Sequence, residues 1–190
     1  GGYKYTGNNR GRAYLYYGGL AADPVADFAL TGAAAGDFFG YSVGTAGDVN
    51  GDGFADLIVG AINNDAGGGN AGQAYVYYGG PAADAIADLT LTGAAASDNF
   101  GHSVGTAGDV NGDGFADVIV GSNFYDGGAL NGGGVFVFHG SSAGPSATAN
   151  WTYFSPQMAE MLGGAVAPAG DVNGDGYADV IVGASYRDGT

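Results

Sequence analysis

Residues 48–56, Asp-Val-Asn-Gly-Asp-Gly-Phe-Ala-Asp, form a segment that the chain repeats at 109–117 and, with Tyr in place of Phe, at 171–179. The first aspartates of the copies, Asp48, Asp109 and Asp171, are 61 and then 62 residues apart. Asp or Asn occupies alternate positions, and the intervening glycines permit the left-handed turns of a loop wrapped around an ion. Hard cations such as Ca²⁺ take roughly six to eight oxygen ligands. The segment therefore predicts three calcium-binding loops.

The residues after each loop indicate which calcium-binding architecture is present. In the first copy the predicted ligands are the side chains of Asp48, Asn50, Asp52 and Asp56 and the carbonyl of Phe54. An EF-hand would place a bidentate Glu at its twelfth position and continue as a helix. The twelfth positions here are Val59, Val120 and Val182. Each loop runs into a short β-branched segment closed by Gly, which predicts a strand, so the loops belong to β-hairpins.

Composition and charge exclude several classes of protein. The chain has 190 residues, 46% of them apolar, which is enough for one sizeable core. It has no cysteine for a disulfide scaffold, and no apolar stretch approaches the length of a membrane span. A net charge of −15 with only 4 basic residues argues against nucleic acid and anionic membranes as partners. Half of the aspartates lie in the three loops, so the predicted calcium ligands account for much of the negative charge.

The chain repeats about every 61 residues, and each repeat predicts four short strands. In the first full repeat these are 41–47, 56–61, 73–79 and 88–93, separated by turn signals. Four antiparallel strands per repeat are the unit of a β-propeller blade. The third strand of the repeat is apolar on both faces, as expected for a sheet packed between two neighbours. The predicted fold is an all-β propeller of four-stranded blades with three repeats per chain.

The repeats divide the chain into four units. Residues 1–32 are expected to form a half-blade of strands three and four, 33–93 and 94–152 to form blades, and 153–190 to form a half-blade of strands one and two. Propellers have about four to eight blades, so three repeats are too few for a ring. Two chains could form a six-bladed homodimer in which each half-blade is completed by the other chain. The alternative is that the chain is a piece of a longer propeller.

These features resemble FG-GAP repeats, the blades of integrin α-subunit propellers and of many bacterial secreted proteins. The resemblance rests on Phe39-Gly40 and Phe100-Gly101, each followed by the acidic loop and by a Leu/Val-Ile-Val-Gly strand. In the third repeat Leu162-Gly163 replaces Phe-Gly. The resemblance implies that Asp109, Asn111, Asp113, Phe115 (carbonyl) and Asp117 are ligands in the second loop, and Asp171, Asn173, Asp175, Tyr177 (carbonyl) and Asp179 in the third.

Three functions of different classes remain open. The first is a calcium-stabilised, non-enzymatic scaffold or binding module with three Ca²⁺ per chain. The second is an extracellular adhesion domain that recognises a protein or glycan through the loops of one propeller face, including 63–72 and 123–134. The third is a lyase or hydrolase on the same frame. Millimolar calcium affinities suit a secreted protein, whose export signal would belong to a precursor.

A sequence pattern typical of a catalytic serine occurs twice in the chain. The segments 40–44 and 101–105 match the Gly-x-Ser-x-Gly nucleophile motif. That chemistry requires a strand-to-helix turn, whereas these segments lie inside predicted strands, so we expect the serines to be packing residues.

The first two full repeats are unusually similar, because residues 44–58 and 105–119 differ only at Leu57 and Val118. Recent duplication and deliberate construction of a symmetric propeller would both explain this similarity.

Overall fold

The computed structural model describes residues 9–20 and 22–186. The expected first and last units extend beyond this range, because residues 1–8, 21 and 187–190 lie outside the described residues. The described residues form twelve strands and no helix, which confirms the all-β prediction. In chain order the strands are β1 (Arg12–Leu15), β2 (Phe28–Thr31), β3 (Phe39–Gly47), β4 (Asp56–Ala61), β5 (Gln73–Tyr77), β6 (Leu89–Thr92), β7 (Phe100–Gly108), β8 (Asp117–Ser122), β9 (Gly134–Phe138), β10 (Trp151–Phe154), β11 (Leu162–Gly170) and β12 (Asp179–Ala184).

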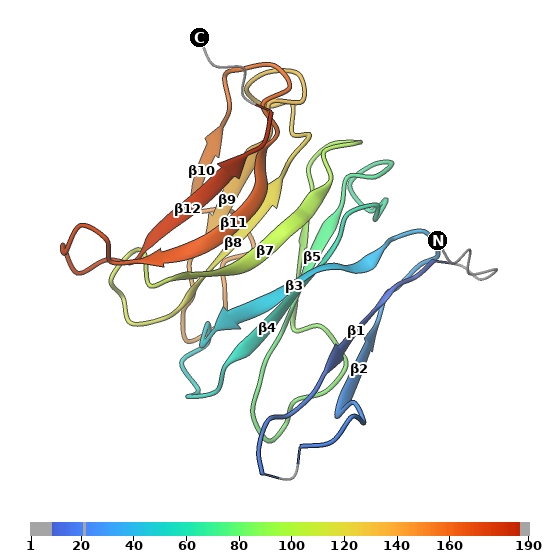
Figure 1. The fold of residues 1–190 in the computed structure, drawn as a ribbon, viewed down its shortest axis with the longest axis vertical. Coiled ribbons are helices and arrows are strands. Elements are labelled where there is room, and N and C mark those ends of the chain that lie inside the picture. Colours follow the sequence, from blue (N-terminus) through green and yellow to red (C-terminus); the bar gives the residue numbers. More distant parts are fainter. Residues whose placement is uncertain (1–8, 21, 187–190) are drawn as a thin grey trace.

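The strands form four antiparallel sheets that follow one another along the chain (Figure 1). Two sheets have four strands each, in the orders β3-β4-β5-β6 and β7-β8-β9-β10. Two more have only two strands each, β1-β2 at one end of the row and β11-β12 at the other. This arrangement is that of consecutive propeller blades. No described helix is long and apolar enough to cross a membrane.

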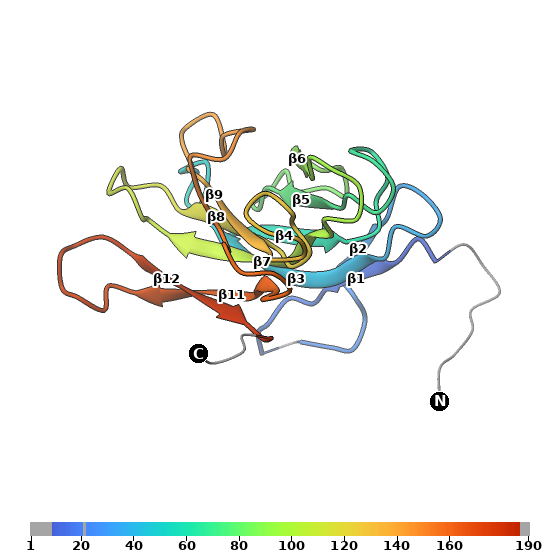
Figure 2. The same ribbon diagram turned by 90° about the horizontal axis from the view of Figure 1, so that it is seen from above.

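Consecutive sheets are joined through their first strands. Strands β3, β7 and β11 pack against one another, and Figure 2 shows them together on one side of the molecule with β5, β6 and β9 on the other. Each first strand begins one residue before a glycine that approaches the preceding sheet. A Cβ on Gly40, whose φ is +83°, would lie 2.4 Å from the Arg12 carbonyl oxygen. The Phe-Gly pairs thus combine a buried ring with a position that tolerates no side chain.

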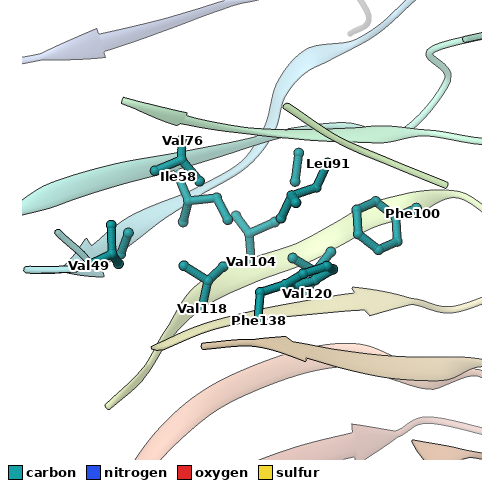
Figure 3. Packing of buried hydrophobic residues seen from close by; sticks show 11 residues of the cluster. Val49, Ile58, Val76, Leu91, Phe100, Val104, Val118, Val120 and Phe138 are labelled. Carbon is teal, nitrogen blue, oxygen red and sulfur yellow. The ribbon is translucent and has the colours of Figure 1, made fainter. Parts of the chain in front are cut away.

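The core lies between the sheets. In Figure 3, Val49 of the first acidic loop and Ile58, Val76 and Leu91 of the adjoining sheet face Phe100, Val104, Val118, Val120 and Phe138 of the next sheet. The rings of Phe39 and Phe100 each pack edge-on against two aromatic rings of their own sheet. Both faces of β5 are buried, as predicted from its pattern. Burial of both faces explains why these strands are almost continuously apolar.

Candidate metal centre

The three acidic loops occupy equivalent places in three successive sheets. Residues 48–56 join β3 to β4, residues 109–117 join β7 to β8, and residues 171–179 join β11 to β12. The loops lie in a row along one edge of the molecule (Figure 1). Each joins strands one and two of its sheet, so the row follows from the repeat itself.

The first aspartate of each loop holds the loop's backbone in place. Asp48 Oδ1 accepts hydrogen bonds from the N–H groups of Gly51 at 2.7 Å and Asp52 at 3.1 Å, and its Oδ2 accepts one from Gly53 at 2.9 Å. The same three bonds recur around Asp109 and around Asp171. For Asp171 the backbone donors lower the pKa of the carboxyl group, chiefly the N–H of Gly176.

The middle residues of the loop form two consecutive side-chain turns. Asn50 Oδ1 accepts the N–H of Asp52 at 2.9 Å, and Asp52 Oδ1 accepts the N–H of Phe54 at 2.9 Å. These are Asx turns, in which a side-chain oxygen takes the place of a backbone carbonyl. Asn50 Nδ2 also donates to Asp52 Oδ2 at 3.0 Å. The loop therefore keeps its oxygen atoms within one short, repeatedly hydrogen-bonded turn.

The last aspartate of the first two loops is buried and ties the loop to the residues that follow the third strand of its own sheet. Asp56 is fully buried; its Oδ2 accepts the Val49 N–H at 2.9 Å and its Oδ1 accepts the Gly79 N–H at 2.8 Å. Asp117 makes the equivalent pair of bonds. Burial raises the pKa of both carboxyl groups, and the backbone donors only partly offset it. Asp179 lies at the same place in the third loop, and among the described residues it accepts only the bond from Val172.

The chemistry of the donor set fits a hard divalent cation. Every side chain predicted as a ligand presents carboxylate or amide oxygen, and the glycines at positions four and six have positive φ, as at Gly51 (75°) and Gly53 (88°). Among the described residues, no three or more His, Asp or Glu side chains are gathered as a metal-ligand group. Three carboxylates in one short loop repel one another unless a cation compensates them. A bound Ca²⁺ would supply that compensation.

Neighbouring loops are also bonded to each other, which the sequence analysis missed. The carbonyl of Asp48 accepts the N–H of Ala116 in the next loop at 3.0 Å, and the carbonyl of Asp109 accepts that of Ala178 at 2.9 Å. The Phe115 ring covers Gly51 so closely that a Cβ there would lie 2.5 Å from it, and Tyr177 covers Gly112 similarly, at 2.7 Å. The signal for these contacts in the sequence is the aromatic residue at the seventh position of all three loops, whose ring as well as its carbonyl takes part in the structure.

The serines of the nucleophile-like motifs have structural partners. Ser42 Oγ donates to the Gly101 carbonyl at 2.7 Å, and Ser103 Oγ accepts the Val166 N–H at 3.0 Å. Both bonds link the first strand of one sheet to the first strand of the next. The serines thus join β3 to β7 and β7 to β11, in line with the expected packing role.

Comparison with known proteins identifies the repeats. The model of the FG-GAP repeat matches residues 39–77, and that of the FG-GAP-like repeat matches residues 109–182. Integrin alpha-5 of Xenopus laevis is 35% identical over 170 residues, which cover 85% of this chain and 16% of that protein. Integrin alpha-PS2 of Drosophila melanogaster is 37% identical over 175 residues, covering 85% of this chain and 12% of that protein. The chain thus spans less than a fifth of the length of these relatives.

Proposed function

Because this chain belongs to the FG-GAP repeat family and is an integrin α-like domain, we propose that it is a calcium-stabilised, non-enzymatic β-propeller module whose three loops each bind one Ca²⁺. The observation that carries the proposal is that one oxygen-rich loop, whose first aspartate accepts the same three backbone hydrogen bonds each time, recurs in three successive sheets. The ligands in this proposal are the Asp and Asn side chains at positions one, three, five and nine of each loop and the carbonyls of Phe54, Phe115 and Tyr177.

Calcium stabilises the folded chain in this proposal because the ligand set exists only in the folded loops. A ligand that binds only the native state adds RT ln(1 + [Ca²⁺]/Kd) per site to the free energy of unfolding. At a calcium concentration of about 100 times Kd this is about 2.7 kcal/mol per site. Part of that gain offsets the repulsion among the three carboxylates of each loop and the burial of Asp56 and Asp117.

The test compares Asp52→Ala with Asp23→Ala. Asp52 lies in the first loop, whereas Asp23 is an exposed aspartate outside the loops whose Oδ1 accepts the Val25 N–H. In calcium, we expect Asp52→Ala to lower the melting temperature and to reduce the calcium stoichiometry in native mass spectrometry from three per chain to two. In chelator the two variants should melt close to the unsubstituted chain. Equal destabilisation by Asp52→Ala in both conditions would contradict the proposal.

The same proposal includes a closed ring. Two chains with three repeats each would make a six-bladed homodimer, within the range of about four to eight blades that propellers have. Its units are the half-blades 1–32 and 153–190 and the blades 33–93 and 94–152. Support comes from the two-stranded sheets at the two ends of the row, β1-β2 and β11-β12, which together have the four strands of a blade.

A second candidate function is recognition of an extracellular protein or glycan, with the protein located outside the cell. The connections 62–72 and 123–133 follow β4 and β8, at the opposite ends of these strands from the acidic loops. The second connection exposes Leu130 (56%), and its carbonyl accepts the N–H of Ala159, next to Met158, which is 71% exposed. Exposed apolar side chains grouped in this way favour a contact surface.

Binding of the chain to matrix-protein and glycan arrays tests this second function. In calcium, where the fold is most stable, we expect Leu130→Asp to abolish a specific binding signal of the chain. Absence of binding by the calcium-loaded chain to every member of both arrays would count against recognition but not against calcium binding.

A further inference from the structure

The hydrogen bond between the first two acidic loops comes from a peptide group that also carries a proposed calcium ligand. The Ala116 N–H donates to the Asp48 carbonyl of the first loop at 3.0 Å. The carbonyl of the same peptide group belongs to Phe115, and it is the proposed carbonyl ligand of the second loop. One planar group therefore connects a ligand position of the second loop to the backbone of the first loop.

The next peptide group along this path leads to a proposed ligand of the first loop. The Asp48 carbonyl and the Val49 N–H belong to one peptide group, and that N–H donates to Asp56 Oδ2 at 2.9 Å. Val49 and Asp56 are both fully buried, so water does not compete for this bond. Two peptide groups in series, which we call the peptide relay, thus join the Phe115 carbonyl to the Asp56 carboxylate.

The peptide relay recurs between the second and third loops. The Ala178 N–H donates to the Asp109 carbonyl at 2.9 Å. On the same peptide group as that carbonyl, the Val110 N–H donates to Asp117 Oδ2 at 2.8 Å. Both relays lie between described repeats, so the relay belongs to the way in which one repeat packs on the next.

A ring contact accompanies each relay. The Phe115 ring of the second loop lies against Gly51 of the first loop, and the Tyr177 ring of the third lies against Gly112 of the second. The Gly51 N–H also donates to Asp48 Oδ1, a proposed ligand oxygen, at 2.7 Å. The ring of one loop therefore covers the turn that places the first ligand of the preceding loop.

The connection between β9 and β10 makes a further link between the first two loops. The Gly140 N–H donates to Asp117 Oδ1 at 2.8 Å, in the second loop. The next residue, Ser141, donates its N–H to the Val49 carbonyl of the first loop at 3.1 Å. Two consecutive residues thus hold a proposed ligand of one loop and the backbone of the other in a fixed relation.

We propose that the calcium sites of neighbouring loops are positively coupled, so that an occupied second loop raises the calcium affinity of the first, and an occupied third loop that of the second. The inference rests on the proposed calcium binding and adds how the sites regulate one another. A carbonyl that holds a cation polarises its peptide group, so its N–H becomes a stronger donor, and hydrogen bonds in a chain strengthen one another. The coupling is reciprocal, as for any pair of linked sites.

Repulsion between bound cations would act in the opposite direction. Each loop carries three aspartates, and a bound Ca²⁺ would neutralise two of the three charges, so a filled loop attracts calcium to its neighbour less than an empty one. The middle residues of the loops are largely exposed, and salt at about 0.15 M screens exposed charges over about 8 Å. The sign of the coupling therefore distinguishes the relay from charge alone.

Asp113→Asn tests this sign in calcium titrations of the 190-residue chain followed by NMR. The amides of Gly51, Gly112 and Gly174 each report on one loop. The substitution removes a ligand of the second loop at an exposed position, so the chain should still fold. We expect the calcium midpoint of Gly51 to rise by at least about fivefold, the lower end of typical coupling between sites. Charge alone predicts a lower midpoint, because the substituted, empty loop is more negative than a filled one. An unchanged or lower Gly51 midpoint would overturn the inference.

Phe115→Ala tests the ring contact without removing a ligand, because the backbone carbonyl stays. We expect this change in the second loop to raise the Gly51 midpoint in the first loop. Phe54→Ala is the matched control, since the Phe54 ring covers no glycine of another acidic loop among the described residues, and it should leave the Gly112 midpoint unchanged. Asp84→Asn, which removes an exposed carboxylate outside the loops, should leave all three midpoints unchanged. An unmoved Gly51 midpoint in Phe115→Ala would overturn the role assigned to the ring.

The same titrations separate this inference from the proposed calcium binding. If none of the three glycine amides responds to calcium, calcium binding is wrong and the coupling with it. If all three respond in the unsubstituted chain and Asp113→Asn leaves the Gly51 midpoint in place, calcium binding stands, the loops bind independently, and the coupling alone is overturned.

Discussion

Strands β8 and β12 begin with the same five residues, Asp-Val-Ile-Val-Gly, and yet they differ in burial. Every residue of β8 is buried, including Ile119 at 0% exposure, whereas Ile181 of β12 is 62% exposed. Strand β8 lies between β7 and β9, while β12 pairs only with β11 among the described residues. In a repeat protein, the sequence of a strand thus specifies which face can be buried, and the neighbouring strands decide whether that face is buried.

The acidic loops show the same contrast. Asp117 is fully buried and accepts one N–H from its own loop and one from Gly140, beyond β9. Asp179 stands in the same sequence context apart from Tyr177 in place of Phe115, but within the part of the chain that the structure describes its sheet has no third strand, and it accepts only the local bond from Val172. In the two-stranded sheet, the isoleucine of the motif is therefore less buried and its aspartate accepts fewer hydrogen bonds than in the four-stranded sheet.

The largest expected difference in stability is between truncating the buried isoleucine of β8 and truncating the exposed isoleucine of β12. Ile119→Ala should lower the free energy of unfolding by about 2–5 kcal/mol, because it leaves a cavity in a packed core. Ile181→Ala should cost no more than about 0.5 kcal/mol under conditions where the chain is monomeric, as for a surface position. Urea denaturation followed by circular dichroism measures both. Equal losses in a monomer would show that β12 is already covered within its own chain.

The last aspartate of the loop, Asp117 in the second copy and Asp179 in the third, tests the same contrast for polar groups. In chelator, Asp117→Asn should destabilise by about 1–3 kcal/mol, because one of two buried N–H donors then faces an amide NH₂. Asp179→Asn should cost less, since a single bond at a partly exposed site is affected. Chemical denaturation in chelator measures the two changes without a contribution from calcium. A larger loss for Asp179→Asn would contradict this account.

The aromatic residue at the seventh loop position provides a smaller contrast. Phe115→Ala should cost about 1 kcal/mol more than Phe54→Ala, because the Phe115 ring packs on Gly51 of the neighbouring loop, whereas the Phe54 ring packs on Gly80 of its own repeat and, among the described residues, covers no glycine of another acidic loop. Thermal unfolding of the monomer at matched calcium concentration measures this difference.

The smallest expected effect concerns titration. Without calcium, burial holds the pKa of Asp117 above its usual 3.8, whereas backbone donors hold the pKa of exposed Asp171 below it. A raised pKa means that the folded state binds the proton more tightly, so the contribution of Asp117 to stability is present below 3.8 and is lost as pH rises through its folded pKa. For Asp171 the contribution is present above 3.8 and is lost as pH falls. Carboxyl carbon NMR titrations of the two residues should give midpoints in this order.

Much of the fold could be predicted from the sequence because its signals are local. The Asp56–Ala61 strand begins and ends as predicted, since the loop and Gly60 delimit it. Strand β3 starts at Phe39 instead of residue 41, because Phe39 pairs with Ala61 beyond a bulge that periodicity does not reveal. The ligand set of each loop remains a prediction that the calcium experiments test.

The contacts between repeats could not be predicted in the same way. Nothing in the Gly-x-Ser-x-Gly pattern indicates that Ser42 bonds to Gly101, 59 residues away. Likewise, the sequence does not show that Phe115 covers Gly51 or that Asp48 bonds to Ala116. Such contacts depend on the distance and twist between sheets, which result from the packing of many side chains at once.

The repeat length, the strands and the oxygen-rich loops can be predicted from the sequence alone, because alternation of side chains, glycine conformation and ligand chemistry are properties of neighbouring residues. The packing of the sheets sets which copies of a motif are buried and hydrogen-bonded, and which, like Val172 and Ile181, are exposed. Apolar burial and loop-to-loop hydrogen bonds require a second surface, so near-identical segments acquire different environments when only some of them have one.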